Sequence, residues 1–292
     1  MINTYDAYLN MARRSNYIEN TFGKIKNEIE LFNGMYLHTT ARLSDRKPLG
    51  DYEFGSFMDN VIEDNEVLAF DRYQSLITTV SLAYRINQKY VTEPHRKVVL
   101  GSNWPLITFT YRKGWDGPLG SDIDFDQLEL AVSQTFKVRT LGTSKYRVST
   151  GKFFNTNGLR FVDYRFHRQS DPLLWSNPLY SFQNIDTTLP ALDYFVEAHY
   201  IHHFNGAIIN YVPFIKKTRI KTVAGGGALW DSRSGYRYVE AFVGLERAFK
   251  IQRQRFRIGV YGVGSESNFG PPKAQLKFSI EFFDTRDGKW NF

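Results

Sequence analysis

The feature that most constrains the fold is an alternation of apolar and polar residues with a period of two. Successive side chains of a β-strand point to opposite faces, so this alternation predicts strands with one apolar and one polar face. The pattern runs through 128–138, 192–204 and 255–262. It is clearest over 273–283, where one parity holds Ala274, Leu276, Phe278, Ile280 and Phe282, and the other holds Lys273, Gln275, Lys277, Ser279 and Glu281. Helix is expected only as a short segment within 5–20.

Turn-forming residues separate the alternating runs, as in 155–158, 231–235 and 270–272. We therefore expect twelve strands, spanning 25–32, 35–43, 73–86, 104–113, 126–139, 145–154, 158–167, 190–204, 218–230, 236–248, 254–264 and 273–283. No linker divides the chain, so residues 1–292 are interpreted as one domain. It would have an N-terminal segment at 1–24, strands over 25–283 and a polar tail at 284–292.

The expected strands are long, and many of them begin or end in aromatic residues. Several reach ten or more residues, whereas soluble sheets use about 5–6 and a membrane-spanning strand needs about 9–11. Aromatic residues at both strand ends are typical of the two membrane interfaces; here they are Trp104, Tyr111, Tyr146, Tyr194, Trp230, Phe256 and Phe282. The pattern favours an all-β, antiparallel up-and-down transmembrane barrel. A soluble β-barrel or sandwich that binds a ligand inside stays open, because such folds alternate as well.

In such a barrel the two parities have different surroundings. The polar parity would face a wet or plugged lumen, and its candidate cluster is Glu197, His199, His203, Glu240, Arg257 and Lys277. The apolar parity would face lipid, and its candidates are Tyr194, Val196, Ile258, Val260, Phe278 and Ile280.

Composition excludes several classes of protein. Aromatic residues make up 16% of the chain, which rules out disorder, and the absence of cysteine excludes disulfides and thiolate sites. A mean hydropathy of −0.40 without a stretch of roughly 20 apolar residues argues against a helical membrane bundle.

The net charge of +7 suits an anionic partner but equally suits a solvated surface. The first residues contain no secretory signal peptide, which alone would indicate the cytoplasm.

Seven stretches resemble a known family. They are Lys89–Gly101, Gly120–Asp126, Tyr146–Lys152, Glu197–Gly206, Asn210–Lys216, Val223–Gly225 and Tyr238–Lys250. In order, they are similar to the C-terminal barrel part of a Bacteroidota-type outer-membrane protein family of unknown function. Its members usually carry a signal peptide and an N-terminal carboxypeptidase-regulatory-like domain. The resemblance implies an outer-membrane location, with membrane lipid and the barrel-assembly machinery as partners, but no activity.

The chain departs from this family at both ends. The family's signal peptide, sandwich domain and first barrel strands are missing, which indicates a partial barrel or a start inside a longer gene. Phe292 is a terminal aromatic residue of the kind that assembly machinery prefers, but it follows a polar tail. A connection at 44–72 is longer than the periplasmic turns of such barrels.

The strongest candidate for chemistry is the group Glu197, His199, His202 and His203. Imidazole and carboxylate side chains can hold a divalent metal. However, residues i and i+4 of a strand lie about 13 Å apart, so one strand cannot offer both His199 and His203 to one ion. We expect a hydrogen-bonded polar cluster and no metal, cofactor or catalytic residue. A membrane-embedded hydrolase with His199 or His203 as base stays an alternative.

Three other motifs carry weak signals. The basic patch Lys216, Lys217, Arg219 and Lys221 could contact phosphate, but we expect a solvated surface and no nucleic acid. The glycines at 225–227 lack the Lys-Ser/Thr of a phosphate loop and are expected to permit a bend or close packing. The aspartates at 122, 124 and 126 lack the spacing of an EF-hand. The favoured function is a non-enzymatic role in envelope transport, surface display or assembly, with unknown periplasmic or surface partners.

Overall fold

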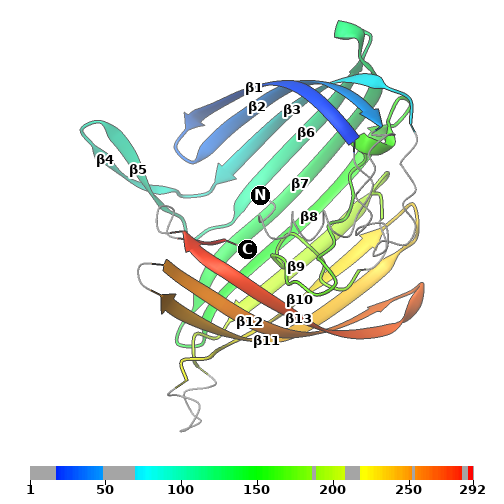
Figure 1. Ribbon diagram of the computed structural model, residues 1–292. Coiled ribbons are helices and arrows are strands. Elements are labelled where there is room, and N and C mark those ends of the chain that lie inside the picture. Colours follow the sequence, from blue (N-terminus) through cyan, green and yellow to red (C-terminus); the bar gives the residue numbers. More distant parts are fainter. Residues whose placement is uncertain are drawn as a thin grey trace.

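One antiparallel sheet of twelve strands dominates the structure, a computed structural model that describes residues 18–48, 70–185, 189–207, 218–251, 254–284 and 289–291. The sheet has the spatial order β1-β2-β3-β6-β7-β8-β9-β10-β11-β12-β13-β14 and curves strongly (Figure 1). Its strands are β1 (Ile18–Phe32), β2 (Met35–Pro48), β3 (Tyr73–Arg85), β6 (Leu106–Asp116), β7 (Asp122–Val138), β8 (Gly142–Asn155), β9 (Phe195–His203), β10 (Lys221–Asp231), β11 (Arg237–Ile251), β12 (Gln254–Ser267), β13 (Gly270–Asp284) and β14 (Lys289–Asn291). The prediction of an all-β antiparallel fold is confirmed.

Individual strand predictions differ from the structure in four places. The strand predicted at 158–167 is wrong, because only a short 3-10 turn at Phe161–Asp163 forms there and the chain stays irregular up to Phe195. A separate hairpin, β4 (Lys89–Glu93) with β5 (Arg96–Gly101), projects from the sheet (Figure 1). The predicted tail at 284–292 contains β14, which pairs with Phe282–Asp284. The helix expected within 5–20 lies mainly outside the described residues, but β1 begins at Ile18, so residues 18–24 of the expected N-terminal segment are strand. Most of the long connection expected at 44–72 is also outside them.

The described strands do not close into a barrel. Within this part of the chain, β1 pairs with β2 alone and β14 with β13 alone. The edge of β13 is partly covered from an unexpected direction, by residues between β8 and β9. The amide of Trp175 donates to the carbonyl of Phe278 at 2.8 Å, and the amide of Phe278 donates to the carbonyl of Leu173 at 3.0 Å.

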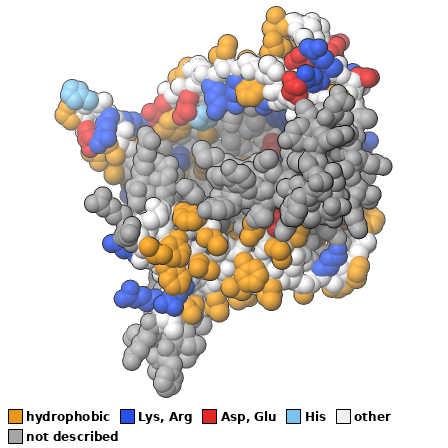
Figure 2. All heavy atoms as spheres, in the orientation of Figure 1, with side chains coloured by type: hydrophobic (Ala, Val, Ile, Leu, Met, Phe, Trp, Pro, Cys, Tyr) orange, Lys and Arg blue, Asp and Glu red, His pale blue; other side chains and the backbone are white. Residues whose placement is uncertain are grey.

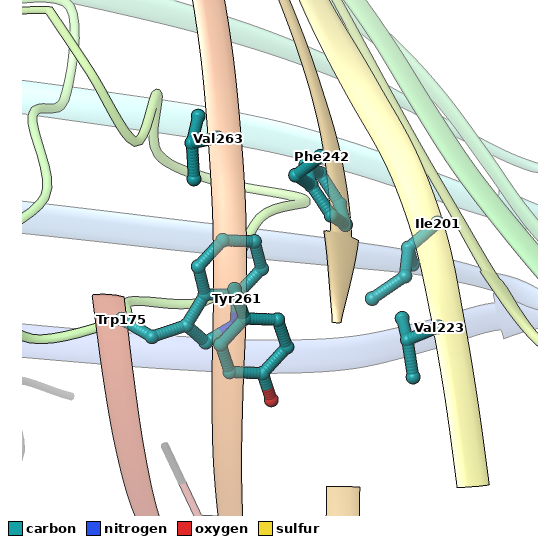
Figure 3. Packing of buried hydrophobic residues seen from close by; sticks show 6 residues of the cluster. All are labelled: Trp175, Ile201, Val223, Phe242, Tyr261 and Val263. Carbon is teal, nitrogen blue, oxygen red and sulfur yellow. The ribbon is translucent and has the colours of Figure 1, made fainter. Parts of the chain in front are cut away.

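The connection between β8 and β9 folds back over the concave face of the sheet (Figure 1). We call residues 156–185 and 189–194 the inner connection. Its Trp175 lies flat on Tyr261, with ring centroids 3.9 Å apart, and meets the edge of Phe242 (Figure 3). These rings form a core with Ile201, Val223 and Val263. The core therefore lies between the sheet and its own connection.

A glycine makes room for this core on the neighbouring strand. The ring of Tyr261 on β12 lies across Gly244 on β11, where a Cβ atom would collide with the ring. A larger residue at 244 would displace Tyr261 and with it the stack on Trp175. The alternation of β11 thus includes a glycine at an inward position for a packing reason.

The convex face carries apolar side chains that none of the described elements covers. Figure 2 shows them gathered over β11 to β13 in the lower part of the view. They include Val243, Leu245, Ile258, Val260, Leu276, Phe278 and Ile280, each at least 40% exposed. Among the described residues, no helix has the length and apolarity needed to cross a membrane.

Candidate functional site

The inner connection is attached to the sheet by buried charged groups, and the principal attachment centres on Glu197 of β9. Arg165 grips this carboxylate with two hydrogen bonds of 2.7 and 2.8 Å, the fork geometry that makes arginine–carboxylate pairs strong. Ser149 of β8 donates a third hydrogen bond at 3.2 Å. Burial of Arg165 opposes its charge, but the bonds to Glu197 outweigh that effect and raise the pKa of the guanidinium.

His167 joins the same network from the inner connection. Its fully buried ring places Nδ1 2.5 Å from Glu197 and Nε2 3.8 Å from Asp231, the last residue of β10. Burial disfavours the charged ring, but the two carboxylates outweigh it and hold the pKa of His167 above its ordinary value. The histidine therefore links the inner connection to both β9 and β10.

A second attachment lies at the start of the inner connection. Asp163 accepts a hydrogen bond of 3.0 Å from the hydroxyl of Tyr73 and pairs with Arg46 at 2.5 Å. The side chains of Arg46 and Asp163 are 6% and 1% exposed, so water hardly screens this pair. It ties the 3-10 turn to β2 and β3, which lie nearer the β1 edge of the sheet than β9 does.

A third attachment involves the strands near the C-terminus. Glu240 of β11 accepts hydrogen bonds from the backbone amides of Gln183 at 2.8 Å and Asn184 at 3.2 Å. Lys277 of β13 is fully buried and donates to the carbonyl of Asp171. The inner connection thus contacts the sheet from β2 to β13, and each of these attachments pairs a buried polar group with a partner on the other part.

The predicted polar cluster forms several groups on the inner face. Glu197, His199, Glu240 and Lys277 are 6%, 4%, 6% and 0% exposed, respectively. Arg257 instead belongs to a separate cluster, where it contacts Glu246 at 2.9 Å and Glu281 at 3.1 Å. His203 lies 3.7 Å from Glu246 in that cluster and away from Glu197.

The predicted outward residues occupy the other side of the strands. Ile258, Val260, Phe278 and Ile280 are 40%, 42%, 48% and 56% exposed, and Tyr194, just before β9, is 39% exposed. Val196 is half-buried.

The arrangement of the histidines does not assemble a metal site. His202 lies on the outer parity, where its Nδ1 is 2.7 Å from Ser144 and its Nε2 faces the carbonyl of Leu141. His199 and His203 are separated along β9. In the part of the chain that the structure describes, no group of three or more His, Asp or Glu side chains can hold a metal ion.

The weaker motifs have structural explanations. At Gly225 a Cβ atom would collide with the carbonyl of Tyr200, and at Gly227 it would press on Phe182 of the inner connection. The glycines therefore permit close packing. Asp126 pairs with Lys113 and Tyr111, whereas Asp122 accepts from the amide of Gln74. Of the basic patch, Lys216 and Lys217 are outside the described residues, and Arg219 and Lys221 are exposed.

Sequence reasoning missed the partners that the inner connection supplies. Arg165, His167 and Asp163 all fall in the segment that was predicted as a strand. The signal that could have found them is its density of charge, since Arg160, Asp163, Arg165, His167 and Arg168 lie within nine positions. So many charges within a predicted strand require partners from other strands.

Comparisons with known proteins give one family. A family model described as "Family of unknown function (DUF5686) C-terminal domain" matches residues 1–245. No curated protein matches the chain. This agrees with the resemblance to a family of unknown function; the bacterial group, the closed barrel and the N-terminal domain that the resemblance implies stay predictions. Because the match covers most of the 292 residues, the chain belongs to the DUF5686 family of unknown function and carries its C-terminal domain.

Proposed function

We propose that this domain forms the wall of an outer-membrane β-barrel with a non-enzymatic role in envelope transport, surface display or assembly. The convex face of the sheet contacts lipid, and the inner connection occupies the lumen. Membrane lipid and the barrel-assembly machinery are the partners that this function implies.

The observation that carries the proposal is the inverted polarity of β13. Leu276, Phe278 and Ile280 are 62%, 48% and 56% exposed. The residues between and after them, Lys277, Ser279 and Glu281, are 0%, 3% and 1% exposed. A water-soluble protein seldom buries Lys and Glu while leaving a contiguous apolar surface uncovered. Lipid against the outer face resolves this contradiction.

The height of the apolar surface suits a bilayer. Outward apolar residues on β13 run from Ala274 to Phe282, which corresponds to about 26 Å along the strand. Strands of outer-membrane barrels tilt by about 35–45°, and their apolar band is about 25 Å tall. A run of this length reaches across most of such a band.

Aromatic pairs mark both ends of the strands. One end carries Phe32 with Tyr84, Phe136 with Tyr146 and Phe249 with Phe256. The opposite end carries Tyr194 with Trp230, and Trp115 on β6. Aromatic residues at two levels are typical of the two membrane interfaces.

The inner connection supports a plugged lumen in place of an open pore. Its attachments to β2, β3, β9, β11 and β13 fill the concave side with buried polar and charged groups. Transport through such a lumen requires the inner connection to move. The hydrolase alternative predicts instead that His199→Ala abolishes an activity while the fold is kept.

The test is to refold residues 1–292 into detergent micelles and to compare boiled and unboiled samples on a gel. We expect a heat-dependent shift in mobility together with β-rich circular dichroism. A folded monomer in detergent-free buffer, without a shift in detergent, would contradict the proposal. Aggregation in both conditions would mean that these strands need further strands to close.

A further inference from the structure

A cavity of about 290 Å³ lies between the inner connection and β7, β8 and β9. It is close to the lower limit of small-molecule sites, about 300 Å³. Its charged and titratable lining comprises Glu129, Arg147, Arg165, Arg168, Glu197 and His199. The attachment of Arg165 to Glu197 accounts for two of these six groups.

The charges of this lining do not cancel. Three guanidinium groups face two carboxylates, which leaves one positive charge among these five groups. Arg165 already holds Glu197 with both of its terminal nitrogens. Arg168 is exposed, and its side chain has no charged or hydrogen-bonded partner among the described residues. A monoanionic group at Arg168 would balance the cavity.

His199 offers an unused acceptor in the same lining. The residue is 4% exposed, and its Nδ1 has no hydrogen-bond partner in the described structure. The ring also has a backbone hydrogen bond with Pro178, and an imidazole with its proton on Nε2 leaves Nδ1 as an acceptor. A buried acceptor without a donor is costly, and a hydroxyl group of a ligand would satisfy it.

Glu129 and an aromatic wall complete the site. The ion pairs of Glu129 with Arg147 and Arg165 are 3.7 and 3.6 Å long, which is longer than hydrogen bonds, so its oxygens can accept from a ligand. Tyr180 lies against Arg147, 5.0 Å from guanidinium to ring centroid, and lines the cavity with Phe166. Flat aromatic surfaces of this kind suit the apolar face of a ring.

We propose that this cavity binds a small hydroxylated monocarboxylate, of which a uronic acid is the type. The carboxylate pairs with Arg168 and Arg147, the hydroxyl groups donate to His199 Nδ1 and Glu129, and the ring lies on Tyr180. This inference goes beyond the proposed function and does not depend on whether the outer face contacts lipid.

The test uses the refolded full chain and three matched probes in titration calorimetry. D-glucuronate carries both the carboxylate and the hydroxyls, D-glucose lacks the carboxylate, and cyclohexanecarboxylate lacks the hydroxyls. We expect D-glucuronate to bind at least about tenfold more tightly than either of the others. Equal affinities for the three probes, or no binding of D-glucuronate up to about 10 mM, would overturn the proposal.

Two variants and a control locate the binding. Arg168→Gln removes the exposed guanidinium, and His199→Gln removes the Nδ1 acceptor while its amide can still reach the carbonyl of Pro178. Each variant is expected to lower the affinity for D-glucuronate about tenfold. The control Arg233→Gln, which replaces an exposed arginine in the turn before β11, should leave this affinity unchanged. If Arg168→Gln behaves like Arg233→Gln, the cavity is not the site. Methyl β-D-glucuronide separates the two sources of the ligand: binding equal to that of the free acid assigns the site to a glycan terminus, and weaker binding assigns it to the free acid.

Discussion

Replacing Val260 by Arg tests the lipid-facing surface most directly. Val260 lies at the middle of β12 with an outward side chain that is 42% exposed, between Leu245 of β11 and Phe278 of β13. The matched control is Val239→Arg, which introduces the same side chain at an outward position that is 54% exposed. Val239 pairs across the strands with Glu266, so the control also offers the new arginine an opposite charge.

The two positions differ in expected depth. Glu266 and Val260 are six residues apart on β12, or about 20 Å along the strand. At a tilt of about 40° this is about 15 Å along the membrane normal, slightly more than half of a 25 Å apolar band. Arginine at the midplane of a barrel costs about 2–4 kcal/mol, and at the interface about 0–1 kcal/mol. The free energy of unfolding should therefore fall by about 2 kcal/mol more for Val260→Arg than for Val239→Arg.

The assay is guanidinium-induced unfolding of both variants in lipid vesicles, followed by tryptophan fluorescence. If water surrounded the outer face, both substitutions would be surface changes of about 0.5 kcal/mol or less. Equal destabilisation of the two variants in vesicles would refute the assignment of the convex face to lipid.

Three further predictions concern the inner connection. Arg165→Met leaves Glu197 buried without its main partner and should lower the free energy of unfolding by about 3–5 kcal/mol in denaturant titrations, whereas the double variant Arg165→Met, Glu197→Met should recover much of it; equal losses would contradict the pairing. Because the pKa of His167 is raised, its charged-state contribution is fully present below its ordinary pKa of 6.5 and is lost as pH rises through the higher folded-state value, so protease cleavage within 156–194 should accelerate with rising pH, and His167→Gln should flatten the profile. Trp175→Ala should cost about 3–5 kcal/mol and remove the near-ultraviolet circular dichroism of the Trp175–Tyr261 stack, whereas an unchanged spectrum would show that the rings do not stack.

The sequence predicted the sheet well because a strand's two faces are recorded in neighbouring residues. Leu276, Lys277 and Phe278 alone show which side chains share a face. The same local rule failed at 158–167, where alternation continues but no partner strand is available. There, the buried pairs of Asp163 with Arg46 and of Arg165 with Glu197 hold an irregular backbone in place.

The candidate site was harder to predict for a related reason. Glu197 and His199 were found from their strand, but the partners that the inner connection supplies to Glu197, Arg165 and His167, lie about thirty residues away in the sequence. Pairing over such distances depends on the path of the inner connection, which no periodicity records. The separation of His203 from Glu197, in contrast, follows from strand geometry alone.

The way in which the inner connection leaves and re-enters the sheet has a mechanical consequence. It starts after β8 and ends before β9, and these strands are hydrogen-bonded neighbours, with Gly151 opposite Phe195. Its two ends are therefore fixed close together whether or not the segment between them is docked. Withdrawing it from the concave face would break side-chain contacts and the pairing of Leu173–Trp175 with β13, yet no rung of the β8–β9 ladder. The inner connection can thus be separated from the sheet, so a force that pulls it off the concave face need not break the pairing of the strands.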